Sequence, residues 1–371
     1  MKIAFLAGAN VIHSVRWIKF FTDRGHEIVW LSFAPPMPEA EELVKKTRFY
    51  EIKPSPLADI NGGLAIRHLP DAVRQIKNIF QAEKPDVLHT HSAGTYGLAA
   101  ALVNFRPAIL TPWGSDILLG GFLRKLVLMF VVGRADAYTC DGENTFQKLI
   151  GLGAEREKIH LIRFGTDVKK FRPAQYKDFA SPYGLAKSQK LRIISLRSLI
   201  SIYDVETLIK TAAIVVKSAS NIEFVIVGDG NQKEYLANLA QDLNLTRYDL
   251  VKFVGRMNNE ELPALLQSAD IYVSASLSDS GLAASTAEAM ATGLPVVVTD
   301  TGDNKDWVDN EFVIPVKSPE LLAEKIVALI KNGEIRKRQG VRNRQIIEEK
   351  NDYRVEMGKI EKIYEEIIAS R

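Results

Sequence analysis

A segment near residue 280 combines a glycine turn with the start of a helix made of small residues. It spans Ser276–Asp300 and contains Asp279, Ser280 and Gly281 immediately before that helix. A glycine turn leading into a helix amino end presents free backbone N–H groups and a positive dipole end, which suits a diphosphate. Glu288 lies about two turns into the helix, where its carboxylate could accept hydrogen bonds from vicinal hydroxyls such as those of a ribose. A solvent-facing Glu288 on a core helix is the equally weighted alternative.

Other candidate residues follow predicted strands. Arg197 directly follows one strand, and its guanidinium fork matches phosphate oxygens, although a surface charge is an equal alternative there. Gly228 and Gly230 end another strand, where a turn alone would also require glycine. Arg256 follows a glycine at the end of a third strand. Each lies where a nucleotide could meet a sheet.

The amino-terminal part of the chain offers a second set of polar residues. Gly8, Asn10 and His13 occupy the turn after the first predicted strand, where a Rossmann-like unit meets its ligand. His89 and His91 form an i, i+2 pair at a strand end, but no third ligand stands at a suitable spacing. We therefore predict no metal site, and for His89 we favour a satisfied, partly buried histidine.

Short β-branched runs alternate with amphipathic helical stretches, which predicts parallel sheets covered by helices. Expected strands of a first series are Lys2–Ala7, Glu27–Ser32, Asp86–His89, Ile109–Thr111, Ala137–Thr139 and His160–Ile162. Between the second and third of these strands, Pro35–Pro56 is read as an irregular connector. A second series has strands at Arg192–Leu196, Glu223–Val227, Val251–Val254, Ile271–Ser274 and Pro295–Thr299, with helices at Val205–Ser218, Gln232–Asn244, Glu260–Ser268 and Ala283–Thr292.

Residues 168–190 contain Pro173 and Pro182 and show no periodicity, so we place a linker there. The sequence thus predicts an α/β protein of two doubly wound parallel-sheet domains facing a cleft, residues 1–167 and 168–352. The last helix, within residues 353–371, has no strand after it and is expected to pack back on the first domain.

Composition limits the function classes. The chain has 371 residues, 46% hydrophobic and 25% charged, with a formal net charge of +3. These values argue against a disordered chain and against a nucleic-acid partner. The single cysteine, Cys140, excludes an intrachain disulfide and a cysteine-built metal cluster. With no signal peptide and no membrane-spanning run, we expect a cytoplasmic protein.

The most apolar stretch, Leu118–Val132, is interrupted by Arg124 and Lys125. Its near lack of a polar face favours a buried core helix. The alternative is a peripheral contact with the inner face of a membrane, which would suit a lipid-linked acceptor.

Several segments together resemble the retaining family 4 glycosyltransferases. Glu288–Val297, EAMATGLPVV, is similar to the signature of that family. Further segments follow in the family's order: Pro85–Gly97, Thr111–Asp116, Ile162–Pro173, Phe224–Gly230 and Phe253–Met257. The resemblance covers nearly the whole chain and implies the GT-B fold, with an acceptor-binding first domain and a nucleotide-sugar-binding second domain.

The resemblance also implies roles for individual residues. It places His91, Arg197 and Asp279 in the catalytic centre. The donor would contact Gly8, Arg197, Tyr203, Gly228, Gly230, Arg256, Ser280, Gly281, Leu282 and Glu288. Asn10, His13 and Asp116 would lie on the acceptor side, although Asp116 could equally cap a helix.

Two positions depart from the family's pattern. Eight positions before Glu288, where the family usually has a glutamate, stands Ser280, with Asp279 beside it. The usual phosphate-binding lysine is replaced by Tyr203, which carries no charge. Asp279 is therefore expected to take over the contact with the donor sugar.

We expect a metal-independent hexosyltransferase that moves a sugar from a nucleotide diphosphate, most simply a UDP-sugar, to a glycan or lipid-linked acceptor. No cofactor is expected. The alternatives are a degenerate transferase that acts as a binding protein, motivated by Ser280 and Tyr203, and a sugar-nucleotide epimerase of the same fold. A nicotinamide-dependent oxidoreductase is disfavoured because no G-x-G-x-x-G motif is complete.

Overall fold

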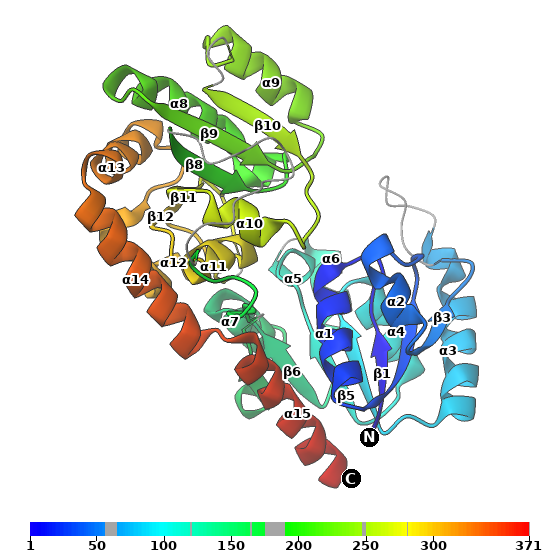
Figure 1. Cartoon of the computed structure of the whole chain (residues 1–371). Helices are drawn as coiled ribbons and strands as arrows, with labels where there is room; N and C mark the ends of the chain where they lie inside the picture. The colour runs from blue at the N-terminus through cyan, green and yellow to red at the C-terminus, as the bar shows by residue number, and fades with distance from the viewer. Residues whose placement is uncertain are drawn as a thin grey trace. The chain divides into compact units, whose positions relative to one another are not determined.

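The computed structural model describes residues 1–55, 65–118, 121–163, 165–174, 190–246, 250–279 and 281–370. Ser280 therefore lies outside the described residues, as does most of the expected linker. The chain divides into two compact units (Figure 1). Unit 1 consists of Met1–Phe164 and Glu356–Arg371, and unit 2 of Gly165–Val355.

Unit 1 is built on a seven-stranded sheet with the order β3-β2-β1-β4-β5-β6-β7. All of its pairs are parallel, and six of its strands match the β-branched runs of the sequence. The strands are β1 (Lys2–Leu6), β2 (Glu27–Ser32), β3 (Arg48–Glu51), β4 (Val87–His91), β5 (Ala108–Thr111), β6 (Ala137–Cys140) and β7 (Ile159–Leu161).

Helices cover both faces of this sheet, as a parallel sheet requires. Ala4 and Leu6 of β1 belong to one core cluster, whereas Phe5, between them, packs 5.9 Å from Phe21 of the first helix. The helices are α1 (Ile12–Asp23), α2 (Glu41–Val44), α3 (Leu69–Glu83), α4 (Thr95–Val103), α5 (Ser115–Leu118), α6 (Phe122–Val132) and α7 (Glu143–Gly151), with short 3₁₀ turns η1 (Pro38–Ala40), η2 (Ala65–His68) and η3 (Arg156–Lys158).

Unit 2 has a six-stranded parallel sheet with the order β10-β9-β8-β11-β12-β13. The strands are β8 (Leu191–Leu196), β9 (Ile222–Val227), β10 (Val251–Gly255), β11 (Ile271–Ser274), β12 (Val296–Thr299) and β13 (Val313–Ile314). The helices are α8 (Val205–Ser218), α9 (Lys233–Asp242), α10 (Leu262–Gln267), α11 (Ala284–Ala291), α12 (Asn304–Trp307), α13 (Pro319–Lys331) and α14 (Gly333–Lys350), with turns η4 (Ser201–Tyr203) and η5 (Asn310–Phe312). Helix α15 (Tyr353–Ala369) ends the chain.

The carboxyl end of α11 is packed tightly against α14. A Cβ atom added at Gly340 of α14 would lie 2.1 Å from the carbonyl oxygen of Gly293, so a side chain cannot be placed there. Asn343 donates to the carbonyl of Leu294 at 2.9 Å, and Arg344 donates to the carbonyl of Ala291 at 2.6 Å. These contacts fix α11 against its neighbour.

Two expectations from the sequence are wrong. Pro35–Pro56 is not an irregular connector, because it contains α2 and the edge strand β3. The apolar stretch ending at Val132 is not a buried core helix either. Only one side of α6 packs inward, through Leu128, Val131 and Val132. Its opposite side is exposed, and Phe122 and Leu123 are 74% and 78% accessible.

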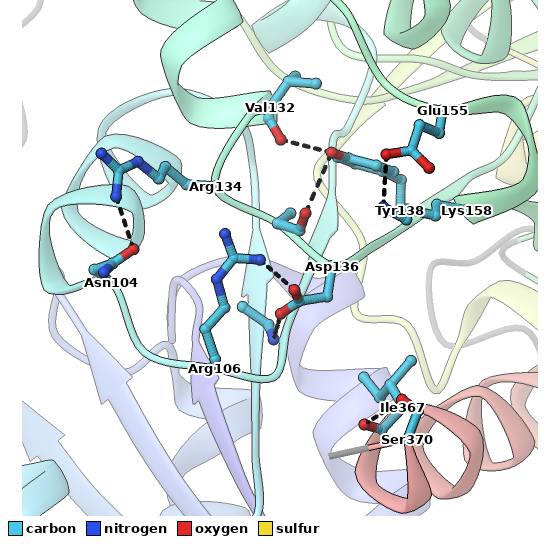
Figure 2. Close-up of polar contacts among 12 residues, drawn as sticks. Asn104, Arg106, Val132, Arg134, Asp136, Tyr138, Glu155, Lys158, Ile367 and Ser370 are labelled. Carbon is cyan, nitrogen blue, oxygen red and sulfur yellow. Dashed lines mark hydrogen bonds and ion pairs between the residues drawn. The ribbon is translucent and has the colours of Figure 1, made fainter.

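The carboxyl end of α6 is held by specific hydrogen bonds (Figure 2). The hydroxyl of Tyr138 in β6 donates to the carbonyl of Val132 at 2.5 Å. Just after the helix, Arg134 donates to the side-chain oxygen of Asn104, which follows α4, at 3.0 Å. The helix is thus an anchored part of unit 1 despite its exposed apolar side. No helix among the described residues combines the length and apolar character needed to cross a bilayer.

His89 is hydrogen-bonded, as expected, in a chain between β4 and the last helix, but it is fully rather than partly buried. Its Nδ1 lies 2.5 Å from the hydroxyl of Tyr364 in α15, and its Nε2 lies 2.6 Å from Oγ1 of Thr111. Burial lowers the pKa of His89 to about 3, which keeps the imidazole neutral.

This burial predicts a pH dependence of stability. Between pH 6.5 and about 3, His89 binds a proton in the unfolded chain but not in the folded one. The free energy of unfolding should therefore fall as the pH falls through this window, by up to about 1.4 kcal/mol per pH unit from this residue. Urea unfolding at several pH values should show that the free energy of unfolding depends less steeply on pH for His89→Gln than for the wild type. His68→Gln is the control. The same pH dependence of the free energy of unfolding in wild type and His89→Gln would contradict the assignment of this effect to His89.

Candidate active site

The strand order of unit 2 creates a crevice at the carboxyl ends of its strands. Strand β8 lies between β9 and β11, so the chain leaves β8 and β11 in opposite directions across the sheet. Ligands of doubly wound sheets bind at such a switch point. Arg197 follows β8 directly, and the segment containing Asp279 follows β11.

The guanidinium of Arg197 is held on three sides. Its Nε donates to Oγ of Ser274 at 3.0 Å, and its Nη2 donates to Oδ2 of Asp279 at 3.0 Å. The ring of Tyr203 lies below it, 5.0 Å from the guanidinium carbon. Nη1 hydrogen-bonds to none of the described residues, so it remains available to a ligand.

Burial governs the charge of this pair. The side chains of Arg197 and Asp279 are 8% and 9% accessible. Burial by itself would lower the pKa of Arg197, but the oxygens of Tyr272, Asp279 and Tyr203 outweigh it and raise that pKa above its usual value. Arg197 is therefore a permanent, oriented cation at the switch point. Tyr203, a departure from the family pattern, contributes a stacking surface here.

The loop that carries Asp279 is supported by the segment after β12. Thr301 donates to Oδ2 of Asp279 at 3.4 Å. Gly302 has a positive φ of 53°, and a Cβ atom there would lie 2.4 Å from the carbonyl oxygen of Gly281. Oδ1 of Asp279 has no hydrogen-bond partner among the described residues. The carboxylate thus has one oxygen engaged and one oxygen available.

Gly228 and Gly230 bring the β9 loop onto the backbone after β8. A Cβ atom at Gly228 would lie 2.0 Å from the carbonyl oxygen of Arg197, and one at Gly230 would lie 2.3 Å from that of Leu199. The structure therefore explains both glycines by close packing around Arg197, in addition to any contact with a nucleotide.

Helix α11 begins beside this loop. Its N-cap residue, Ala283, makes no side-chain hydrogen bond to the first turn, so the side chain leaves those N–H groups uncapped. Leu282 is half-buried against the core. Glu288 is only 6% accessible, so the alternative of a solvent-facing carboxylate is wrong. Arg256, at the end of β10, is exposed and has no ion-pair partner among the residues described.

Unit 1 has the corresponding switch point between β1 and β4. Gly8, Asn10 and His13 follow β1, and His91 is the last residue of β4. Burial, followed by the charge of Arg16, lowers the pKa of His13 to about 4. A Cβ atom at Gly8 would lie 2.9 Å from Oδ1 of Asn10. This turn is therefore compact.

His91 is buried among aromatic rings. Its Nδ1 lies 3.0 Å from Oγ of Ser14, and the rings of Trp17 and Trp113 lie edge-on at 5.1 and 5.0 Å. Nε2 is buried and has no partner among the described residues. His91 is only 1% accessible, so a ligand can reach Nε2 only if the side chains around the ring move.

Both carboxylate oxygens of Asp116 are engaged in local structure. Oδ2 accepts from the backbone N–H of Ala93 at 2.6 Å, and Oδ1 accepts from that of Trp113 at 2.9 Å. Burial raises the pKa of Asp116. Its observed role is to join the loops after β4 and β5.

The sequence reasoning missed Ser274, Thr301, Ser14 and Trp113. Each contacts a predicted site residue from a different segment of the chain. Ser274 could have been found, because it ends a predicted strand beside the one that precedes Arg197. No signal in the sequence places Trp113 against His91.

Comparison with known families agrees with this arrangement. A model described as "Glycosyl transferases group 1" matches residues 178–346, and one described as "Glycosyl transferase 4-like" matches residues 2–137. The chain belongs to the glycosyl transferases group 1 family. Its resemblance to family 4 is thereby confirmed.

One curated relative matches nearly the whole chain, and another matches about half of it. N-acetyl-alpha-D-glucosaminyl L-malate synthase of Bacillus anthracis is 22% identical over 94% of this chain and 92% of its own length. The amylovoran biosynthesis glycosyltransferase AmsK of Erwinia amylovora is 30% identical, over 49% of this chain and 44% of its own.

Solved structures show the same fold. Sucrose-phosphate synthase from Thermosynechococcus elongatus has a TM-score of 0.84 at 18% identity, covering 100% of both chains. Anabaena HepE in complex with UDP-glucose has a TM-score of 0.81 at 18% identity, covering 99% of this chain and 100% of its own. The two parallel-sheet α/β domains of this group 1 chain form the GT-B fold.

The close packing at Gly228 predicts a specific loss of stability. Gly228→Ala should destabilise unit 2 by about 2 kcal/mol or more, because the new methyl group collides with the Arg197 carbonyl and φ is 144°. Gly255→Ala is the matched control: it also has a positive φ, 74°, but its Cβ would meet nothing within 4 Å. We expect Gly255→Ala to lower the free energy of unfolding by about 1 kcal/mol. Equal losses in denaturant titrations would refute the packing argument.

Proposed function

We propose that this group 1 protein transfers a hexose from a UDP-sugar to a glycan or lipid-linked acceptor, with retention of the anomeric configuration. The product would belong to a cell-surface polysaccharide or glycoconjugate. The observation that carries the proposal is the oriented cation, Arg197, at the switch point next to the uncapped start of α11. Support comes from the amylovoran glycosyltransferase among its relatives and from UDP-glucose in the HepE complex.

The proposed chemistry breaks the bond between the anomeric carbon and the β-phosphate oxygen. Negative charge then develops on the leaving diphosphate. Nη1 of Arg197 and the N–H groups of α11 would stabilise that charge where it appears, so the reaction needs no metal. The acceptor oxygen bonds to the anomeric carbon on the same face, and its proton passes to the leaving phosphate.

Other parts of unit 2 would hold the nucleotide. Glu288 would accept hydrogen bonds from the ribose hydroxyls, and Tyr203 would keep the guanidinium plane fixed. The remaining donor contacts in this proposal come from the backbone and edge of the crevice: Gly228, Gly230, Arg256, Ser280, Gly281 and Leu282.

The transferred sugar would be recognised by polar atoms that the fold leaves unpaired. Oδ1 of Asp279 and Nε2 of His91 have no partner among the described residues, and each can bind a hydroxyl. Gly8 would allow close approach of the donor to the β1 turn. On the acceptor side we place Asn10, His13 and the loop fixed by Asp116.

Two variants test the donor site. Arg197→Ala should lower kcat by about 100-fold, because the leaving phosphate loses a charged donor. Glu288→Ala should weaken UDP binding by about tenfold or more in calorimetry, through the lost ribose contact. Glu234→Ala, at the start of α9, provides the control and should retain wild-type values. Wild-type affinity in Glu288→Ala, or wild-type turnover in Arg197→Ala, would remove that residue from the site.

The same assay separates the enzyme from its rivals. Slow hydrolysis of a UDP-sugar without acceptor is expected of a transferase. A degenerate binding protein would bind UDP and hydrolyse nothing, and an epimerase would convert the sugar without releasing UDP. Either result would overturn the proposal.

Helix α6 supports an acceptor at a membrane surface. Its exposed side carries Phe122, Leu123, Leu126, Val127, Met129 and Phe130. Arg124 and Lys125 lie among them, and residues 117–135 contain no Asp or Glu. Apolar side chains flanked by cations suit the interface of an anionic bilayer. We therefore place the protein in the cytoplasm, bound peripherally to the inner face of the membrane.

Vesicle sedimentation tests this contact. Replacing Phe122 and Leu123 by serine should weaken binding to phosphatidylglycerol vesicles by at least about tenfold, because each apolar side chain contributes about 1.5–3 kcal/mol. Val341→Ser, at another exposed apolar site in α14, should bind normally. Equal binding by all three proteins would contradict the contact, and a concentration-dependent dimer lost in the double variant would assign the surface to a second copy.

A further inference from the structure

The basic residues at the carboxyl edge of the unit 2 sheet are largely neutralised within the protein. Lys233 pairs with Asp229 at 3.5 Å, and Lys305 pairs with Asp300 at 2.5 Å. Both pairs are about half-exposed, so water and salt screen them and a ligand can separate them at little cost.

Arg197 and Asp279 form a buried pair at this edge. Their side chains are 8% and 9% accessible, and their charged atoms lie 3.0 Å apart. In such a setting each charge is strongly stabilised by the other, and removing one partner leaves an uncompensated buried charge. A diphosphate that binds Arg197 brings its own negative charge to within a few ångströms of the Asp279 carboxylate.

The geometry points to Asp279 as a built-in counter-ion that competes with the donor diphosphate for Arg197. This inference rests on the proposed function, and it adds a second role for Asp279 beyond a contact with the sugar. The carboxylate orients the guanidinium before the donor binds. It then limits how tightly the diphosphate is held, which favours release of the nucleotide product after transfer.

The arrangement of the two carboxylate oxygens supports this exchange. Oδ2 holds Arg197 and receives the weaker contact from Thr301 at 3.4 Å, whereas Oδ1 has no partner among the described residues. When phosphate oxygens bind the available Nη1, they share the charge of the guanidinium with the carboxylate, which keeps Thr301 and can bind a sugar hydroxyl through Oδ1. Asp279 would therefore bind more strongly to a UDP-sugar than to UDP alone.

The decisive measurement is the affinity of UDP for Asp279→Asn, an isosteric change that removes the charge. If Asp279 competes for Arg197, this variant should bind UDP about tenfold more tightly than the wild type, and its kcat should fall as UDP release slows. If Asp279 only supported the loop, Asp279→Asn would instead weaken UDP binding or leave it unchanged. Asp300→Asn is the matched control, because it removes the same charge at the same sheet edge from an exposed pair. Its affinity should stay within about twofold of the wild type.

A double variant tests whether the effect acts through Arg197. In the Arg197→Ala background, Asp279→Asn should no longer tighten UDP binding. If Asp279→Asn does not fold, Asp279→Ser serves the same purpose. Unchanged or weaker UDP binding by folded Asp279 variants would overturn the counter-ion role while leaving the transferase intact. Absence of UDP binding and turnover in the wild type would instead overturn the proposed function.

Discussion

The order of the strands in unit 2 is the constraint on which the candidate site depends. Because β8 lies between β9 and β11, residues 82 positions apart in the chain meet at one sheet edge. Arg197 and Asp279 are there because each follows one of two adjacent parallel strands. The guanidinium then keeps a single orientation, since Ser274, Asp279 and Tyr203 each constrain a different part of it.

Close approach of backbones completes this arrangement. Gly228 lets the β9 loop pack against the carbonyl of Arg197, and Gly302 lets the β12 loop pack against Gly281. The carboxyl ends of four neighbouring strands are therefore joined directly to one another. In unit 1 the same topology places His91 beside the β1 turn, but aromatic side chains rather than ion pairs surround it.

The sequence predicts most of the architecture because buried parallel strands are continuous apolar runs, and five of the six strands of unit 2 were located to within about two residues. β3 was missed, since RFYE at a sheet edge lacks that pattern. Arg197, Asp279 and Glu288 were singled out by local signals. The ion pair between the first two, the burial of His91 among aromatic rings and the exposure of α6 depend on tertiary packing, which periodicity does not encode.

The junction between α11 and α14 has a consequence for donor selectivity. Gly293 and Gly340 are in backbone contact. Asn343 and Arg344 donate hydrogen bonds to backbone carbonyls at and just after the end of α11. These contacts prevent α11 from sliding along its axis, so the position of its amino end is fixed. In the proposed transferase, a bulkier or smaller sugar would have to be accommodated by the loops around this end of the helix. Substitutions that change donor preference should then accumulate in those loops, while the α11–α14 contacts stay unchanged.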